Sequence, residues 1–223
     1  MGFLDDLKRQ ADEAKARQTT DIGALERNSS LADSAAKTAS TYITSLVQQL
    51  NVLKPVSKVS YRLDNRNAFD ALPMSDFRSD VRRKRVRGAD VFDHVSLRWR
   101  LKSGKKLTLA KNFLPEIERL ESRLRRGGAQ FHAATVRNPE NNKLQEMRYE
   151  FVADFEAAVT VTPDHDTGRV RFELVNLGGF ETINVDFAAF EVGNARLDEL
   201  ARLILGEPNA FLKGGQGVRL VEA

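Results

Sequence analysis

Apolar side chains recur at helical spacing through the first 53 residues of the chain. No proline occurs before Pro55, and the helix-favouring residues alanine, leucine, glutamine and lysine are plentiful. The polar run at 18–21 predicts an interruption, with Asp21 as the N-cap of a second helix. The first helix then buries one face, which consists of Phe3, Leu4, Leu7, Ala11 and Ala14.

The second helix carries apolar or small residues at alternating steps of three and four, which is a heptad seam. Small residues in its middle would let another backbone approach closely. Two alternatives stay open: the seam packs against the protein's own sheet, or it meets a second copy of the chain. The candidates for such self-association are Ile22, Leu25, Ala32, Ala36, Ala39, Ile43, Leu46 and Leu50.

After Pro55 the apolar period changes to two, which predicts strands at 58–63, 77–87 and 95–101. The last of these has the clearest alternation, with Val95, Leu97, Trp99 and Leu101 on one face. Ser103 and Gly104 predict a tight turn, after which 107–109 completes a hairpin. A helix over 115–126 follows and stops at two glycines.

The second half repeats this order. Strands are predicted at 131–137, over a long run at 147–161, and at 170–174 and 183–187, and a helix begins near Asn194. The chain is therefore expected to be an α+β protein with an antiparallel sheet and helices on one face. The repeated order raises the hypothesis of a duplicated ββββα unit. Its divisions are a helical region at 1–53, one half at 54–126, a second half at 127–206 and a tail at 207–223.

The charges are divided unevenly along the chain. Residues 54–126 hold 20 basic and 9 acidic side chains, a net charge of +11, whereas residues 127–223 hold 9 and 15, a net charge of −6. Acidic side chains such as Glu150, Asp154 and Glu156 occupy the polar face of the long predicted strand. The two halves can therefore pair within one chain or between copies, since complementary charge orients partners.

The basic half predicts a surface that attracts polyanions. Trp99 lies among the inward apolar positions, and no helix-turn-helix, zinc-finger or ribonucleoprotein motif occurs. Binding would therefore depend on phosphate contacts and would weaken with salt. The candidate residues for polyanion binding are Arg82, Arg83, Lys84, Arg85, Arg87, Arg98, Arg100, Lys102, Lys105 and Lys106.

Several chemistries lack support in the sequence. There is no cysteine, which excludes disulfides and thiolate chemistry. The turn at 164–168 departs from a calcium loop, because Gly168 stands at the third ligand position. No Gly-x-Ser-x-Gly, phosphate loop or dinucleotide fingerprint occurs, so no catalytic residue, metal or cofactor is expected. The chain lacks a signal peptide and any apolar run long enough for a bilayer, so a cytoplasmic location without membrane contact is expected.

The leading interpretation is a non-enzymatic interaction or scaffold protein that forms a homo-oligomer through the seam. The alternative is a protein that binds nucleic acid or another polyanion through the basic strands at 82–106. A small-molecule-binding protein, or an enzyme without a linear motif, is the third class.

Overall fold

The computed structural model describes residues 3–222, with side chains at residue 10 and from residue 21 onward. The elements, in order, are α1 (Phe3–Leu53), β1 (Tyr61–Arg62), β2 (Ala68–Phe69), β3 (Met74–Val86), β4 (Ala89–Leu101), β5 (Lys106–Lys111), α2 (Leu114–Arg126), β6 (Phe131–Arg137), β7 (Leu144–Val152), β8 (Phe155–Asp164), β9 (Arg169–Val175), β10 (Glu181–Ala188), the 3-10 helix η1 (Ala189–Glu191), α3 (Asn194–Ile204) and β11 (Gln216–Glu222).

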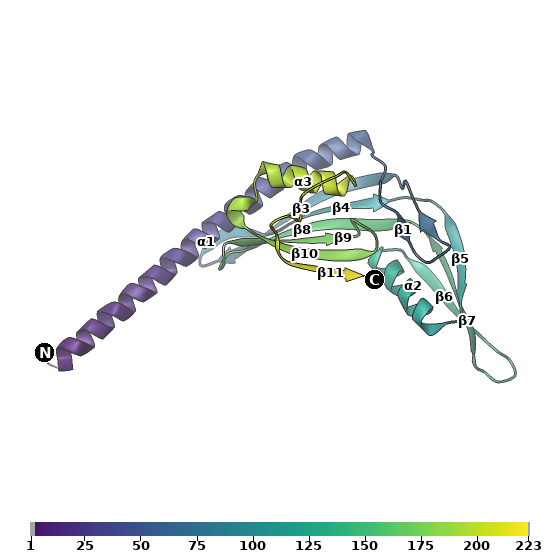
Figure 1. Cartoon of the computed structure of the whole chain (residues 1–223), viewed down its shortest axis with the longest axis horizontal. Coiled ribbons are helices and arrows are strands. Elements are labelled where there is room, and N and C mark those ends of the chain that lie inside the picture. Colours follow the sequence, from purple (N-terminus) through teal and green to yellow (C-terminus); the bar gives the residue numbers. More distant parts are fainter. Residues whose placement is uncertain (1–2, 223) are drawn as a thin grey trace.

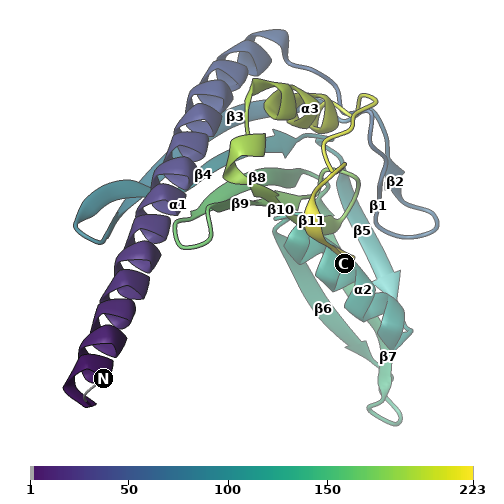
Figure 2. The same ribbon diagram turned by 60° about the vertical axis from the view of Figure 1, so that its left-hand side comes forward.

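The strands form a large six-stranded antiparallel sheet in the order β11-β10-β9-β8-β4-β3 and a three-stranded sheet in the order β5-β7-β6. Helices α1 and α3 lie side by side over one face of the large sheet (Figures 1 and 2). The Tyr42 hydroxyl on α1 donates a 2.6 Å hydrogen bond to Asp198 on α3. The predicted α+β class with an antiparallel sheet is confirmed.

Helix α1 is continuous, so the predicted interruption at 18–21 is wrong. This run contains neither glycine nor proline, and threonine or aspartate costs a helix only about 0.7 kcal/mol per residue. The predicted face from Phe3 to Ala14 lies outside the described side chains. Figure 1 shows the N-terminal part of α1 running past the end of the sheet.

The heptad seam of α1 packs inside the chain, across β3, β4 and β8. Ala32, Ala36, Ala39 and Ile43 are fully buried, and the last three belong to one core with the inward side chains of the sheet. Those side chains include Val95, Leu97, Trp99 and Leu101, as the alternation predicted. Alanine at the centre of the seam lets the helix lie close to the sheet, which is how a narrow layer is filled without cavities.

The predicted long strand at 147–161 is in fact two strands in different sheets. It divides at Ala153 and Asp154, between β7 in the small sheet and β8 in the large one. The Asp154 carboxylate accepts 2.9 Å hydrogen bonds from the backbone N–H groups of Ser103 and Gly104. The chain between β4 and β5 is therefore fixed to the same point, and β5 pairs with β7 rather than forming the predicted hairpin with β4.

The predicted duplication is not visible in the arrangement of strands. The first half contributes β3 and β4 to the large sheet, whereas the second half contributes β8, β9 and β10. Helix α2 lies against the small sheet, where Ile117, Leu120 and Leu124 are buried. The predicted strand at 58–63 is reduced to the two residues of β1, and the tail supplies the edge strand β11.

Candidate anion-binding site

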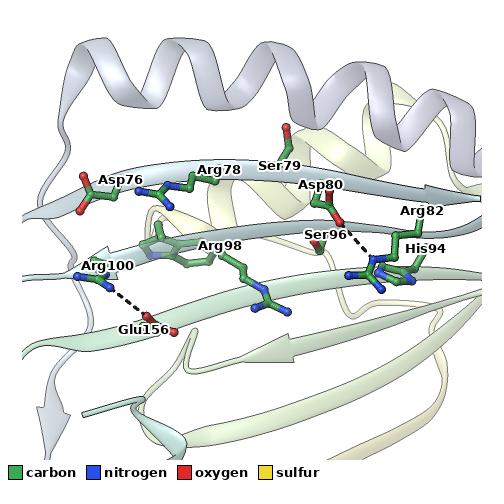
Figure 3. Close-up of a pocket in the computed structure, with 11 residues that line it drawn as sticks. Asp76, Arg78, Ser79, Asp80, Arg82, His94, Ser96, Arg98, Arg100 and Glu156 are labelled. Atoms are coloured by element: carbon green, nitrogen blue, oxygen red, sulfur yellow. Dashed lines mark ion pairs between the residues drawn. The ribbon is translucent and has the colours of Figure 1, made fainter. Parts of the chain in front are cut away.

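The face of the large sheet away from α1 and α3, which we call the open face, contains a hollow over β3, β4 and β8 (Figure 3). Its volume is about 700 Å³. Four of its side chains are arginines from two neighbouring strands. We call it the arginine hollow, and its lining consists of Asp76, Arg78, Ser79, Asp80, Arg82, His94, Ser96, Arg98, Trp99, Arg100 and Glu156.

A β-bulge in β3, held by hydrogen bonds from α1, lies at one end of the stretch of β3 and β4 that carries the arginines. Ser75 pairs with Arg100 and Arg78 pairs with Arg98, so Asp76 and Phe77 lie opposite Trp99 alone. The Asn51 side chain on α1 accepts a 3.1 Å hydrogen bond from the Phe77 N–H and donates a 2.9 Å bond to the Phe77 carbonyl. The amide of Asn51 thus replaces the ladder bonds that the bulge removes. Bulges change the direction of nearby side chains, and this one sets Arg78 opposite Arg98.

A second bulge lies at the other end, and α1 holds it too. Arg82 pairs with His94 and Arg83 pairs with Phe92, which leaves Asp93 without a partner in the ladder. The Phe92 N–H donates a 2.7 Å hydrogen bond to Asp33 of α1. The arginines of the hollow therefore lie on a stretch of β3 and β4 whose register is fixed from the opposite face of the sheet.

Arg78 and Arg98 are directly opposed across the two strands and both are exposed. Among the side chains that the structure describes, no carboxylate forms an ion pair with either guanidinium. Like charges directly opposite in an antiparallel pair destabilise a sheet. The pair is therefore a concentration of positive charge with no carboxylate at ion-pair distance among the described side chains.

The other cations of the hollow have acidic neighbours. Arg82 lies 3.7 Å from Asp80, and Arg100 lies 3.6 Å from Glu156. Just outside the hollow, Lys102 lies 2.9 Å from Asp76, and its hydrogen bond lowers the pKa of that carboxyl. Each of the three carboxylates thus has its own cation, and all three pairs are exposed enough to exchange partners.

A second hollow on the open face shows the contrasting case. It has a volume of about 360 Å³ and lies over β3, β8, β9 and β10. Its arginines are occupied: Arg171 lies 2.9 Å from Asp186, and Arg169 donates to the Asp186 carbonyl. Asp166, on its lining, forms an ion pair with Arg87. Arginines without an ion pair therefore distinguish the first hollow from the second.

Two buried polar groups lie beneath the arginines. Ser96 is 6% exposed, and Trp99, which is 2% exposed, packs against Phe77 with ring centroids 5.9 Å apart. The indole N–H of Trp99 has no hydrogen-bond partner among the described residues. A buried donor without an acceptor costs free energy.

The structure separates the predicted polyanion-binding residues into groups. Arg82, Arg98 and Arg100 line the arginine hollow. Lys102 lies just outside it and forms an ion pair with Asp76, whereas Lys84 lines the second hollow and forms an ion pair with Asp93. The others lie elsewhere: Arg83 packs over the Phe92 ring, Arg85 bonds Gly88, Arg87 pairs with Asp166, and Lys105 and Lys106 lie at the start of the small sheet.

Sequence reasoning missed Arg78, which is the partner of Arg98. It also missed Asp76, Asp80, His94 and Ser96 as lining residues. Local alternation places Arg78 at the start of a strand without saying which residue it faces. The signal that would have identified it is the bulge, and the bulge depends on Asn51, which is distant in the sequence.

Five of the eight self-association candidates are unavailable to a second copy. Ala32, Ala36, Ala39, Ile43 and Leu50 are buried within the chain. Ile22 is 50% exposed, and Leu25 and Leu46 are partly covered. The structure thus selects intramolecular packing for most of the seam. Self-association itself stays a prediction, which light scattering at micromolar concentration tests.

The basic and acidic halves meet within one chain. Strand β4, from the basic half, pairs directly with β8, from the acidic half. The Arg100–Glu156 and Arg87–Asp166 ion pairs join the same two halves. The charge complementarity read from the sequence is therefore used inside the fold.

The turn at 164–168 has a structural explanation. The Asp164 carboxylate accepts hydrogen bonds from the N–H groups of Asp166 and Thr167, and the His165 ring is buried against the Phe92 carbonyl. Among the described residues, no cluster of three potential metal ligands occurs. Likewise, no described helix combines the length and apolar character needed to cross a bilayer.

Comparisons of this chain with protein-family models, with curated proteins and with solved structures find no match. Function must therefore be argued from the chemistry of the site, because a fold alone does not determine it.

Proposed function

We propose that this protein is a non-enzymatic binding protein that holds the phosphate backbone of a nucleic acid on the open face, over β3 and β4. The observation that carries the proposal is the Arg78–Arg98 pair, which lacks a carboxylate partner among the described side chains and lines a hollow with two further arginines. Guanidinium groups bind phosphate oxygens through two parallel N–H bonds. An anion between the strands would relieve the repulsion that the free protein carries.

The character of the surface favours a nucleic acid over an acidic protein. Protein interfaces usually have an apolar core, whereas nucleic-acid interfaces are polar and positively charged. The arginine hollow is lined by charged residues and small polar ones, and its single large apolar residue, Trp99, is buried. Arg98 and Arg100 on β4, and Lys102 directly after its end, follow one another at every second position, which suits an extended chain of phosphates.

The proposed binding does not read sequence. Recognition of unpaired bases uses exposed aromatic rings as stacking surfaces. The aromatic residues of the described sheet core, including Trp99, Phe155 and Phe172, are buried on the face covered by the helices. Binding is therefore expected to depend on salt and to vary little with base composition.

The test is fluorescence anisotropy with a labelled single-stranded 20-mer and its duplex, titrated at about 50 mM salt. The triple variant Arg82→Gln, Arg98→Gln, Arg100→Gln should bind more than about tenfold more weakly than the parent protein. The control removes the same charge elsewhere, as Arg119→Gln, Arg125→Gln, Arg202→Gln on α2 and α3. Absence of binding by the parent, or equal loss in both variants, would overturn the proposal. Equal affinity for polyglutamate of matched charge would assign the surface to an acidic protein instead.

A further inference from the structure

The charge inventory of the arginine hollow indicates more than a general preference for anions. Four arginines of the lining, Arg78, Arg82, Arg98 and Arg100, together with Lys102 just outside it, lie near the carboxylates Asp76, Asp80 and Glu156. Three of the cations neutralise the three carboxylates. The surplus of two positive charges lies on Arg78 and Arg98, at one cross-strand pair.

We infer that Arg78 and Arg98 form a clamp for one phosphate monoester, the doubly charged group found at a phosphorylated strand end. An internal phosphodiester carries a single negative charge, whereas a monoester carries about −1.5 to −2 at neutral pH. A monoester therefore matches the surplus of the hollow and a diester leaves part of it uncompensated. This inference rests on the proposed function and names the part of the nucleic acid that enters the hollow.

The shape of the site supports a strand end. A volume of about 700 Å³ lies within the range of small-molecule pockets, which admits a terminal nucleotide. The bulge at Asp76 and Phe77 is held from the α1 side, so the backbone positions of Arg78 and Arg98 are already opposite one another before a ligand arrives. A backbone that is already in register has less conformational freedom to lose on binding.

An additional donor lies at the same place. The Ser96 hydroxyl belongs to the lining of the hollow. A terminal phosphate presents three strong acceptor oxygens and can satisfy more donors at once than a diester. Arg171, on the same face, is already paired with the Asp186 carboxylate.

The experiment compares one labelled 12-mer in two forms, with a 5′-phosphate and with a 5′-hydroxyl, at about 50 mM salt. The parent protein should bind the phosphorylated form at least about fivefold more tightly. Arg78→Gln and Arg98→Gln should each remove this preference, and the double variant should lose no more than either single one, because both guanidinium groups hold the same phosphate. Arg171→Gln, a matched control on the open face, should keep the preference.

The outcomes separate the two proposals. Equal binding of both forms by the parent overturns the clamp while leaving backbone binding intact, and additive losses in the double variant also overturn it. If the parent binds neither form, the proposed function fails. The clamp is then tested separately, by the effect of inorganic phosphate on the unfolding temperature. Phosphate should raise the unfolding temperature of the parent more than chloride at equal ionic strength, and this difference should vanish in the double variant. An equal response to both salts would overturn the clamp.

Discussion

Asn51 is the residue through which helix α1 determines the position of the arginine hollow. Its amide makes two hydrogen bonds, of 2.9 and 3.1 Å, with the backbone of Phe77 at the bulge. Asn51→Ala removes both. A typical intramolecular hydrogen bond contributes about 1 kcal/mol net, and alanine returns about 0.5 kcal/mol of helix propensity. The expected loss is therefore about 1.5 kcal/mol, which lowers the unfolding temperature of a protein of this size by roughly 3–6 °C.

The assay is thermal unfolding combined with oligonucleotide anisotropy on the same variants. Asn51→Asp keeps the acceptor for the Phe77 N–H but loses the donor, so it should show about half the loss. Gln48→Ala, an exposed position of the same helix, should change the stability by less than about 0.5 kcal/mol. Asn51→Ala should also weaken oligonucleotide binding, although Asn51 does not line the hollow. Unchanged stability and unchanged affinity together would refute the role of α1 in setting the register.

Three further predictions concern stability. Arg98→Gln should raise the unfolding temperature of the free protein by about 1–2 °C, because it removes a cross-strand repulsion of about 0.5 kcal/mol. This gain should shrink at high salt, which screens the repulsion. The control Arg171→Gln, which breaks an ion pair, should give no gain. Ala36→Leu should destabilise the fold by about 1–3 kcal/mol, since Ala36 is fully buried in the chain. An unchanged unfolding temperature with an altered mass by light scattering would instead place the seam between copies. The pKa of Asp64 is lowered from 3.8 to about 2, because burial, which raises it, is outweighed by hydrogen bonds from the Arg66 backbone, Lys111 and Asn67. The Asp64 carboxylate therefore stabilises the fold above pH 4, and this contribution is lost as the pH falls toward 2. The difference in unfolding free energy between the parent and Asp64→Asn should shrink by about 1–2 kcal/mol over that interval.

Patterns that depend on local spacing were predictable from the sequence. The alternation of Val95, Leu97, Trp99 and Leu101 identified the strand and its buried face, because one residue step reverses every side chain. The seam of α1 gave the correct buried face of the helix at Ala32, Ala36, Ala39 and Ile43. In each case the apolar period follows directly from the geometry of the element.

Features that depend on distant contacts were not predictable in the same way. The division of the long strand depends on Asp154 bonding the turn at Ser103 and Gly104, and nothing in the local pattern marks it. The Arg78–Arg98 pair depends on a bulge whose missing ladder bonds are supplied by Asn51. Sequence reasoning therefore found the arginines on β4 and missed their partner on β3.

The central claim is that Arg78 and Arg98 bind a phosphate group. The most direct measurement is the dependence of oligonucleotide affinity on salt for the parent protein and for the double variant Arg78→Gln, Arg98→Gln. Each phosphate contact with a single strand adds about 0.7 to the slope of log affinity against log salt. We expect weaker binding by the double variant and a slope that is shallower by about 0.7. The same affinity and the same slope in both proteins would contradict the claim.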